Sequence, residues 1–168
     1  MNKKKCFFLD RDGVINKNYG HIKKKENIKI LSGVIDGIKY LNKKKFLVII
    51  ITNQSVVGRG LITENKLIKI HQYLIKNLKV KGARIDDIFY CPNHPKFGIG
   101  KYKKKSLDRK PGNGMLEKAI KKWNIDRSKS FMIGDQKTDM MAAKKSKIKF
   151  FYKKKIDFFS QIYSIGLK

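Results

Sequence analysis

The chain has 168 residues, 41% of them hydrophobic, and its 41 lysine and arginine residues outnumber 13 acidic ones to give a formal net charge of +28. This length and apolar content suit one globular domain with a full core, spanning residues 1–168. No apolar run approaches the roughly 20 residues that span a bilayer, and the apolar patch after Lys3–Lys5 ends at Asp10, too early for a signal peptide, so we expect a cytoplasmic protein with no membrane partner.

The positive charge has two interpretations. It could mark a nucleic-acid-binding surface or a solvated surface enriched in lysine. The second is favoured because only five of the 41 basic residues are arginine and no aromatic stacking platform accompanies the lysine runs. The runs are also dispersed along the chain, at Lys3–Lys5, Lys23–Lys25, Lys43–Lys45, Lys103–Lys105 and Lys153–Lys155. We therefore expect no specific nucleic-acid partner.

In chain order, the sequence predicts strands and helices that alternate. The first half predicts a strand at 5–9, a helix at 34–44, a strand at 46–51 and a helix that begins near Thr63. The second half predicts a strand at 87–91, a long loop at 92–111, a helix at 113–123, a strand at 130–133, a helix at 138–145, a strand at 148–152 and a closing helix at 156–165. This alternation predicts an α/β fold, a Rossmann-like three-layer sandwich with a central parallel sheet.

Polar side chains follow the predicted strands where each strand ends. Asp10 and Asp12 follow the first strand, the segment Thr52–Ser55 follows the second, and Asp135 follows the fourth. The long loop ends in Arg109 and Lys110. In parallel sheets the ligand site lies beyond the carboxyl ends of the strands, so we expect these groups to meet there.

The types of side chain in this set indicate a chemistry. Clustered carboxylates repel one another unless a cation relieves them, and Mg²⁺ is the usual cation for oxygen ligands. Hydroxyl, amide, arginine and lysine groups are suitable donors to phosphate oxygens. Each motif alone could be a turn, a helix cap or a solvated loop. Four of them at successive strand ends favour phosphoryl transfer through an aspartyl-phosphate.

The motifs resemble those of a known family. The strings FFLDRDGVIN, ITNQSVVGRG, CPNHP, DRKPGNGML and MIGDQKTDM occur in order between about residue 5 and residue 145. They are similar to the haloacid dehalogenase-like phosphatases, in particular the subfamily that acts on heptose bisphosphate and histidinol phosphate. The resemblance implies a haloacid dehalogenase-like fold with a minimal cap and a monomeric enzyme.

The resemblance also implies roles for matching residues. Asp10 would be the nucleophile, and Asp12 the general acid and then the general base. Mg²⁺ would bind the side chains of Asp10 and Asp135 and the backbone carbonyl of Asp12. Thr52 and Lys110 would hold the phosphoryl group. Asp139 would orient the metal site or cap its helix.

A further set of residues would contact the substrate, if the resemblance holds. The set consists of Asn18, Tyr19, Gly20, His21, Asn53, Gln54, Ser55 and Arg109. The substrate expected first is heptose 1,7-bisphosphate, which would lose its 7-phosphate on the route to lipopolysaccharide core heptose. The alternatives are histidinol phosphate, a phosphorylated nucleic-acid end, or no substrate at all in a basic binding protein that has lost catalysis.

The chain departs from the family's pattern in the long loop. Members usually carry a structural zinc site there, with one histidine and three cysteine ligands. Cys91 remains, but Asn93, Ser106 and Asp108 occupy the other three ligand positions. A closed zinc site needs four nitrogen or sulfur ligands, so we expect no zinc and a loop held by packing.

Overall fold

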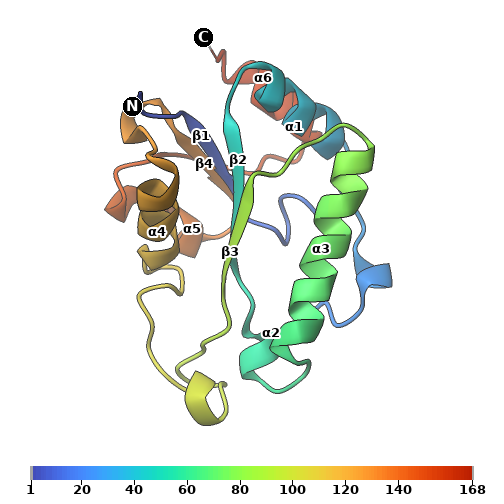
Figure 1. Cartoon of the computed structure of the whole chain (residues 1–168), viewed down its shortest axis with the longest axis vertical. Coiled ribbons are helices and arrows are strands. Elements are labelled where there is room, and N and C mark those ends of the chain that lie inside the picture. Colours follow the sequence, from blue (N-terminus) through green and yellow to red (C-terminus); the bar gives the residue numbers. More distant parts are fainter. Residues whose placement is uncertain (1, 168) are drawn as a thin grey trace.

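The computed structural model describes residues 2–167, and its centre is a parallel sheet of five strands (Figure 1). The strands are β1 (Cys6–Leu9), β2 (Leu47–Asn53), β3 (Asp87–Cys91), β4 (Phe131–Gly134) and β5 (Lys149–Tyr152), in the spatial order β3-β2-β1-β4-β5. β1 is central and pairs with β2 on one side and β4 on the other. The residues that follow β1, β2 and β4 therefore meet at the middle of the carboxyl edge.

Helices cover both faces of the sheet. They are α1 (Val34–Lys43), α2 (Ser55–Gly58), α3 (Glu64–Val80), α4 (Gly114–Trp123), α5 (Lys137–Lys145) and α6 (Phe158–Ser164). Short 3-10 helices occupy Lys25–Asn27, Gly100–Tyr102 and Arg127–Lys129. In Figure 1, α4 and α5 lie on one side of the strands and α1, α3 and α6 on the other, which is the predicted three-layer sandwich.

Alternate side chains of each strand supply two separate cores. Phe7 and Leu9 of β1 pack with the α1, α3 and α6 side, whereas Cys6 and Phe8 pack with α4 and α5. The period of two along a strand explains the split, because successive side chains point to opposite faces. A sheet buried on both faces produces the uninterrupted apolar runs seen in the sequence.

The predicted elements are confirmed, with differences at their ends. β2 extends to Asn53, because Thr52 and Asn53 still pair with Tyr90 and Cys91 of β3. Two predicted site residues thus belong to a strand rather than to the loop after it. α2, with four residues, was not predicted because it is too short to show a helical period.

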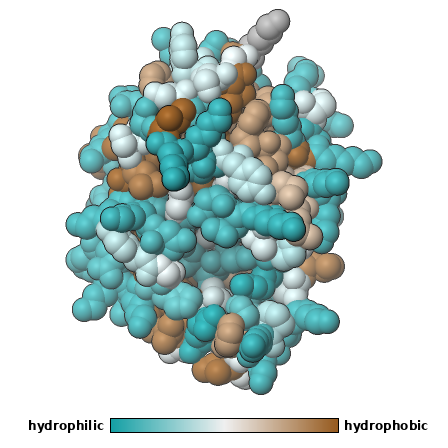
Figure 2. Space-filling view, turned by 180° about the vertical axis from the view of Figure 1, so that it is seen from behind, coloured by the Kyte–Doolittle hydropathy of each residue, from teal (hydrophilic) through white to brown (hydrophobic). Residues whose placement is uncertain are grey.

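The surface is dominated by hydrophilic side chains, and hydrophobic ones gather mainly toward the end where the strands begin (Figure 2). Among the helices of residues 2–167, none has the length and apolar character needed to cross a membrane.

Candidate active site

A hollow of about 180 Å³ lies at the carboxyl edge of the sheet. It is lined by Asp10, Asp12, Asn18, Gly20, His21, Thr52, Asn53, Gln54, Ser55, Val56, Lys110, Asp135, Gln136, Thr138 and Asp139. Most of the residues predicted for the site therefore lie together. The two predicted residues outside this lining are Tyr19, which is exposed beside the Lys17 ammonium, and Arg109.

A buried lysine joins two carboxylates at the floor of the hollow. The Lys110 Nζ lies 2.9 Å from Asp10 Oδ1 and 2.6 Å from Asp139 Oδ1, and it donates a hydrogen bond of 2.8 Å to the Ile51 carbonyl. All three charged side chains are almost fully buried. A buried cation with two carboxylates needs such close geometry, because each charge has lost its water.

Burial changes the proton affinity of this group. Desolvation raises the pKa of Asp10 to about 6, although the neighbouring Lys110 opposes the rise. For Lys110, burial alone would lower the pKa, but Asp10 and Asp139 outweigh it and raise the pKa above the ordinary lysine value. The lysine therefore stays protonated at neutral pH and serves as a fixed positive charge.

Asp12 is held by donors from its own loop and from Gln54, which follows β2. Arg11 donates from Nε (3.2 Å) and Nη2 (2.9 Å) to Asp12 Oδ1, and Asn16 Nδ2 donates to the same oxygen at 2.9 Å. Gln54 Nε2 donates to Asp12 Oδ2 at 2.9 Å, and Arg11 Nη2 contacts that oxygen at 2.8 Å. The carboxylate of Asp12 thus has a fixed orientation beside that of Asp10.

A buried histidine contacts the arginine that holds Asp12. Arg11 is fully buried, and its Nη1 lies 3.0 Å from Nε2 of the buried His71 on α3. Burial, together with the smaller effect of the Arg11 charge, lowers the pKa of His71 to about 3, so the ring is neutral. A guanidinium only donates, so Nε2 must be the acceptor and the proton lies on Nδ1.

Three carboxylates could hold a cation. Asp10, Asp135 and Asp139 each place an oxygen within 4.8 Å of the others. Asp135 Oδ1 is buried and has no hydrogen-bond partner among the described residues, and burial raises the pKa of this carboxyl. A hard divalent cation such as Mg²⁺ fits this set, because it would supply the missing partner and relieve the repulsion.

Gly13 keeps room for this cluster. Its φ is +83°, and a Cβ added there would overlap the Asp135 carboxylate. Both the backbone conformation and the space require glycine after the pair of acids.

Asp139 has two structural roles. Its Oδ2 accepts from the Gln136 backbone N–H at 3.0 Å, which completes a capping box at the start of α5. Its other oxygen contacts Lys110. The sequence predicted a capping or orienting role, but the contact with Lys110 was not predicted.

Asn53 and Thr52 also line the hollow. Asn53 holds the Lys110 backbone from both sides, since Nδ2 donates to the Lys110 carbonyl and Oδ1 accepts from its N–H, each at 3.0 Å. The Thr52 hydroxyl accepts from Gln54 Nε2 at 2.9 Å, which leaves its own proton available to a ligand.

Two arginines, Arg59 and Arg109, lie near each other outside the lining of the hollow. Arg109 is partly buried, and both burial and the nearby Arg59 lower its pKa. The Arg59 Nε is buried without a hydrogen-bond partner among the described residues. Arg59 also lowers the pKa of His21, which lines the hollow. Cationic groups that lie close enough to affect one another are suited to an anionic ligand. The sequence predicted Arg109 but not Arg59, although both belong to motif strings.

The loop that carries Arg109 and Lys110 is tied to α3. Glu64 Oε1 accepts from the Tyr90 hydroxyl at 2.8 Å, and Oε2 accepts from the Tyr102 hydroxyl at 3.0 Å. Within the loop, Arg109 Nη1 donates to the Asn93 carbonyl at 3.1 Å. The Tyr102 and Arg109 contacts, in addition to the predicted packing, hold the loop against the rest of the protein.

Comparison with known proteins bears on the chemistry. The sequence model of the haloacid dehalogenase-like hydrolase family matches residues 96–153 of this chain. A D-glycero-beta-D-manno-heptose-1,7-bisphosphate 7-phosphatase of Rhodopseudomonas palustris is 41% identical over 137 residues, which cover 82% of this chain and 76% of that protein. Its counterpart in Haemophilus influenzae is 38% identical over 149 residues, covering 89% of this chain and 79% of that protein.

Solved structures agree on the fold. A HAD-like phosphatase from Mesorhizobium loti superimposes with a TM-score of 0.83 at 28% identity, covering 87% of this chain and 70% of that one. The D,D-heptose 1,7-bisphosphate phosphatase of B. bronchiseptica, complexed with magnesium and phosphate, superimposes with a TM-score of 0.79 at 23% identity, covering 96% and 97%.

Proposed function

This chain belongs to the heptose-1,7-bisphosphate 7-phosphatases, a family of haloacid dehalogenase-like hydrolases, and on that premise we propose that it removes the 7-phosphate of D-glycero-D-manno-heptose 1,7-bisphosphate through an aspartyl-phosphate. It is a phosphoric monoester hydrolase. The observation that carries the proposal is the buried Asp10, 2.9 Å from the Lys110 ammonium and beside the fixed carboxylate of Asp12.

The geometry supports a two-step reaction. An Asp10 oxygen attacks phosphorus, and the bond between phosphorus and the C7 oxygen breaks as Asp12 donates a proton to that oxygen. Asp12 then takes a proton from a water molecule, which attacks phosphorus and releases phosphate from Asp10. Lys110 and the Thr52 hydroxyl stabilise the negative charge on the phosphoryl oxygens.

Mg²⁺ is the proposed cofactor. The side chains of Asp10 and Asp135 would hold it together with the Asp12 backbone carbonyl, and it would supply a positive charge against the transferring phosphoryl group. The unpartnered Asp135 oxygen supports this assignment.

The two neighbouring arginines favour a bisphosphate. Arg59 and Arg109 would meet the phosphate that is not removed, because a dianion relieves the repulsion between two guanidinium groups. Histidinol phosphate, the second candidate, carries a single phosphate and a cationic amine that these arginines would repel. The heptose substrate is therefore preferred.

The proposal extends to cellular context. We assign the enzyme to the route that supplies heptose for the lipopolysaccharide core, in the cytoplasm and with no specific nucleic-acid partner. We also propose that the enzyme acts as a monomer.

Phosphate release from the purified protein tests the proposal. Heptose 1,7-bisphosphate, histidinol phosphate and a 3′-phosphorylated oligonucleotide would each be assayed with and without Mg²⁺. We expect Mg²⁺-dependent release from the heptose bisphosphate, lowered at least about 10³-fold by Asp10→Asn. Asp36→Asn, an exposed aspartate on α1, is the matched control and should behave like the natural protein. Faster release from histidinol phosphate would overturn the substrate, and no release from any compound would overturn the activity.

A further inference from the structure

A hollow larger than the active site lies elsewhere on the described part of the chain. A groove of about 820 Å³ lies at the opposite edge of the sheet, where the strands begin. It is lined by Lys3, Lys4, Lys5, Lys45, Phe46, Leu47, Ser128, Lys129, Phe131, Lys149, Ile165, Gly166 and Leu167. We call it the amino-edge groove. Lys5 and Asp10 are five residues apart along an extended strand, so the groove lies about 17 Å from the active site.

Lysines from separate parts of the sequence converge on this groove. Two of the dispersed runs, Lys3–Lys5 and Lys43–Lys45, contribute to it, and Lys129 and Lys149 join them at the starts of β4 and β5. The described lining contains six lysines and no acidic side chain. Among the described acidic residues, the partly exposed Asp126 is the one seen to act on Lys3 and Lys129. Even with Lys5 set aside, the other five lysines of the lining bring together like charges that an anion would relieve.

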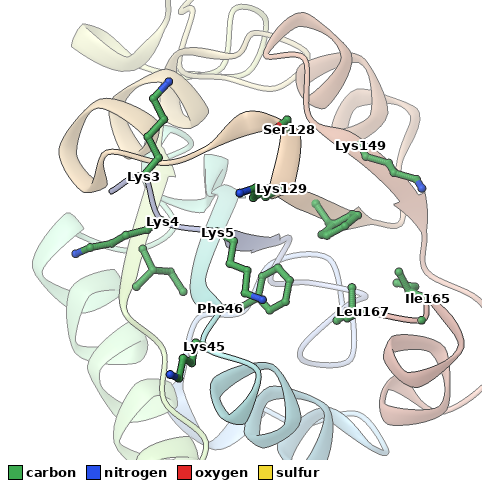
Figure 3. Close-up of a pocket in the computed structure, with 13 residues that line it drawn as sticks. Lys3, Lys4, Lys5, Lys45, Phe46, Ser128, Lys129, Lys149, Ile165 and Leu167 are labelled. Atoms are coloured by element: carbon green, nitrogen blue, oxygen red, sulfur yellow. The ribbon is translucent and has the colours of Figure 1, made fainter. Parts of the chain in front are cut away.

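The floor of the groove is apolar and partly aromatic. Lys5 Nζ lies 4.4 Å from the ring centroid of the buried Phe46, and Lys149 Nζ lies 6.0 Å from that of Phe131. Phe131 and Ile165 are only partly buried and leave apolar surface at the floor. Figure 3 shows the Lys5 and Lys129 ammonium groups near the centre of the groove, while Lys3, Lys4 and Lys149 extend from its rim.

We propose that the amino-edge groove binds a nucleoside polyphosphate. Lysine ammonium groups suit a chain of phosphates, and the apolar floor suits the flat face of a base. The volume lies within the range of small-molecule sites and exceeds that of the active-site hollow, whereas a concave surface is less suited to a flat membrane. The ligand would be bound and not hydrolysed there, because the described lining offers no carboxylate for a metal or a nucleophile.

A charge-reversal pair with a matched control tests the proposal. The probe is the β,γ-imido analogue of ATP, titrated calorimetrically at 0.15 M salt into the natural protein and two double variants. Lys129→Glu with Lys149→Glu alters exposed lysines of the groove. Lys76→Glu with Lys79→Glu makes the same change in net charge on exposed positions of α3. Neither pair touches the active site, so phosphate release should be unchanged in both.

The groove pair should weaken the binding by roughly tenfold or more, and the α3 pair by less than about twofold. Tripolyphosphate should bind the natural protein more weakly than the nucleotide analogue, because it lacks the base. Equal losses in the two double variants would show that net charge alone is responsible and overturn the proposal. Undiminished binding by the variant with Lys129→Glu and Lys149→Glu would mean that the probe binds elsewhere, and this would overturn the proposal. The proposal would also be overturned if a single-stranded oligonucleotide displaced the probe at a lower concentration than the nucleotide itself, because the ligand would then be a nucleic acid.

Discussion

The two halves of the active site are held in different ways. Asp10, Thr52 and Asp135 stand at the ends of β1, β2 and β4, whose backbones pair within one sheet. Lys110 lies instead at the end of a long loop, whose regular structure among the described residues is the short 3-10 helix Gly100–Tyr102. Its place depends on a few side-chain contacts, chiefly from Asn53. Many backbone hydrogen bonds between the strands position the residues of the sheet half. A single substitution should therefore disturb the loop half more than the sheet half.

The largest effect is expected where the two halves meet. Lys110→Met should destabilise the fold by about 3–5 kcal/mol, because Asp10 and Asp139 would stay buried without their shared cation. Urea unfolding at pH 7 measures the loss. The control is Lys118→Met, whose exposed lysine pairs with Asp108 at the surface and should cost less than about 1 kcal/mol. Equal losses in both variants would mean that the buried contact has no special weight.

In the sheet half, His71 contacts Arg11, which in turn holds Asp12, and this histidine should make the free energy of unfolding depend on pH. Burial holds the pKa of His71 at about 3 in the folded protein, against 6.5 for an ordinary histidine. Between these values the unfolded chain binds a proton that the folded chain does not, so stability falls as the pH is lowered from about 6.5 toward 3. At pH 5 the loss amounts to about 2 kcal/mol, at roughly 1.4 kcal/mol per pH unit.

His71→Gln should remove this part of the pH dependence. Glutamine does not titrate, and its oxygen can still accept from Arg11. Unfolding free energies at pH 7 and pH 5 should therefore differ by about 2 kcal/mol less in the variant than in the natural protein. His94→Gln changes a less buried histidine in the loop and should leave most of the difference in place. The assignment is wrong if both variants keep the full pH dependence.

The same contrast explains what the sequence could and could not predict. Asp10, Thr52 and Asp135 could be placed together because each follows an apolar run, and parallel strands bring their carboxyl ends to one edge. The contact between Arg11 and His71 could not be predicted, since the residues are 60 positions apart. One signal existed: His71 lies four residues after Leu67, within a helix whose apolar stripe is buried.

The long loop was less predictable for a physical reason. A loop has no periodic pattern, so its sequence does not indicate which side chains meet. Nothing in the residues around Glu64 indicates that its two oxygens bind tyrosines 26 and 38 positions away. The contact between Lys110 and Asp139 is similar, because it depends on how the first turn of α5 faces the loop.

A smaller effect is expected from loosening the loop at α3. Glu64→Gln leaves one acceptor for two tyrosine hydroxyls and should cost about 1 kcal/mol. Hydrogen exchange of the amides around Tyr102 should accelerate, while that of β1 and β4 should not change. Glu26→Gln, at an exposed site, is the control. Unchanged exchange near Tyr102 would show that other contacts hold the loop.

The smallest effect is expected from zinc. The positions that would hold it are occupied by groups with other partners: Ser106 Oγ accepts from the Asp108 N–H, and Asp108 pairs with Lys118. His94 Nδ1 accepts from two backbone amides. We therefore expect metal analysis to find no stoichiometric zinc, and a zinc chelator to leave exchange in the loop unchanged. The opposite result would be one zinc per chain whose removal makes amide exchange in the loop faster. The buried Cys91 would then bind the metal together with His94, which would give up its two backbone partners. In that case the loop half would be held as firmly as the sheet half.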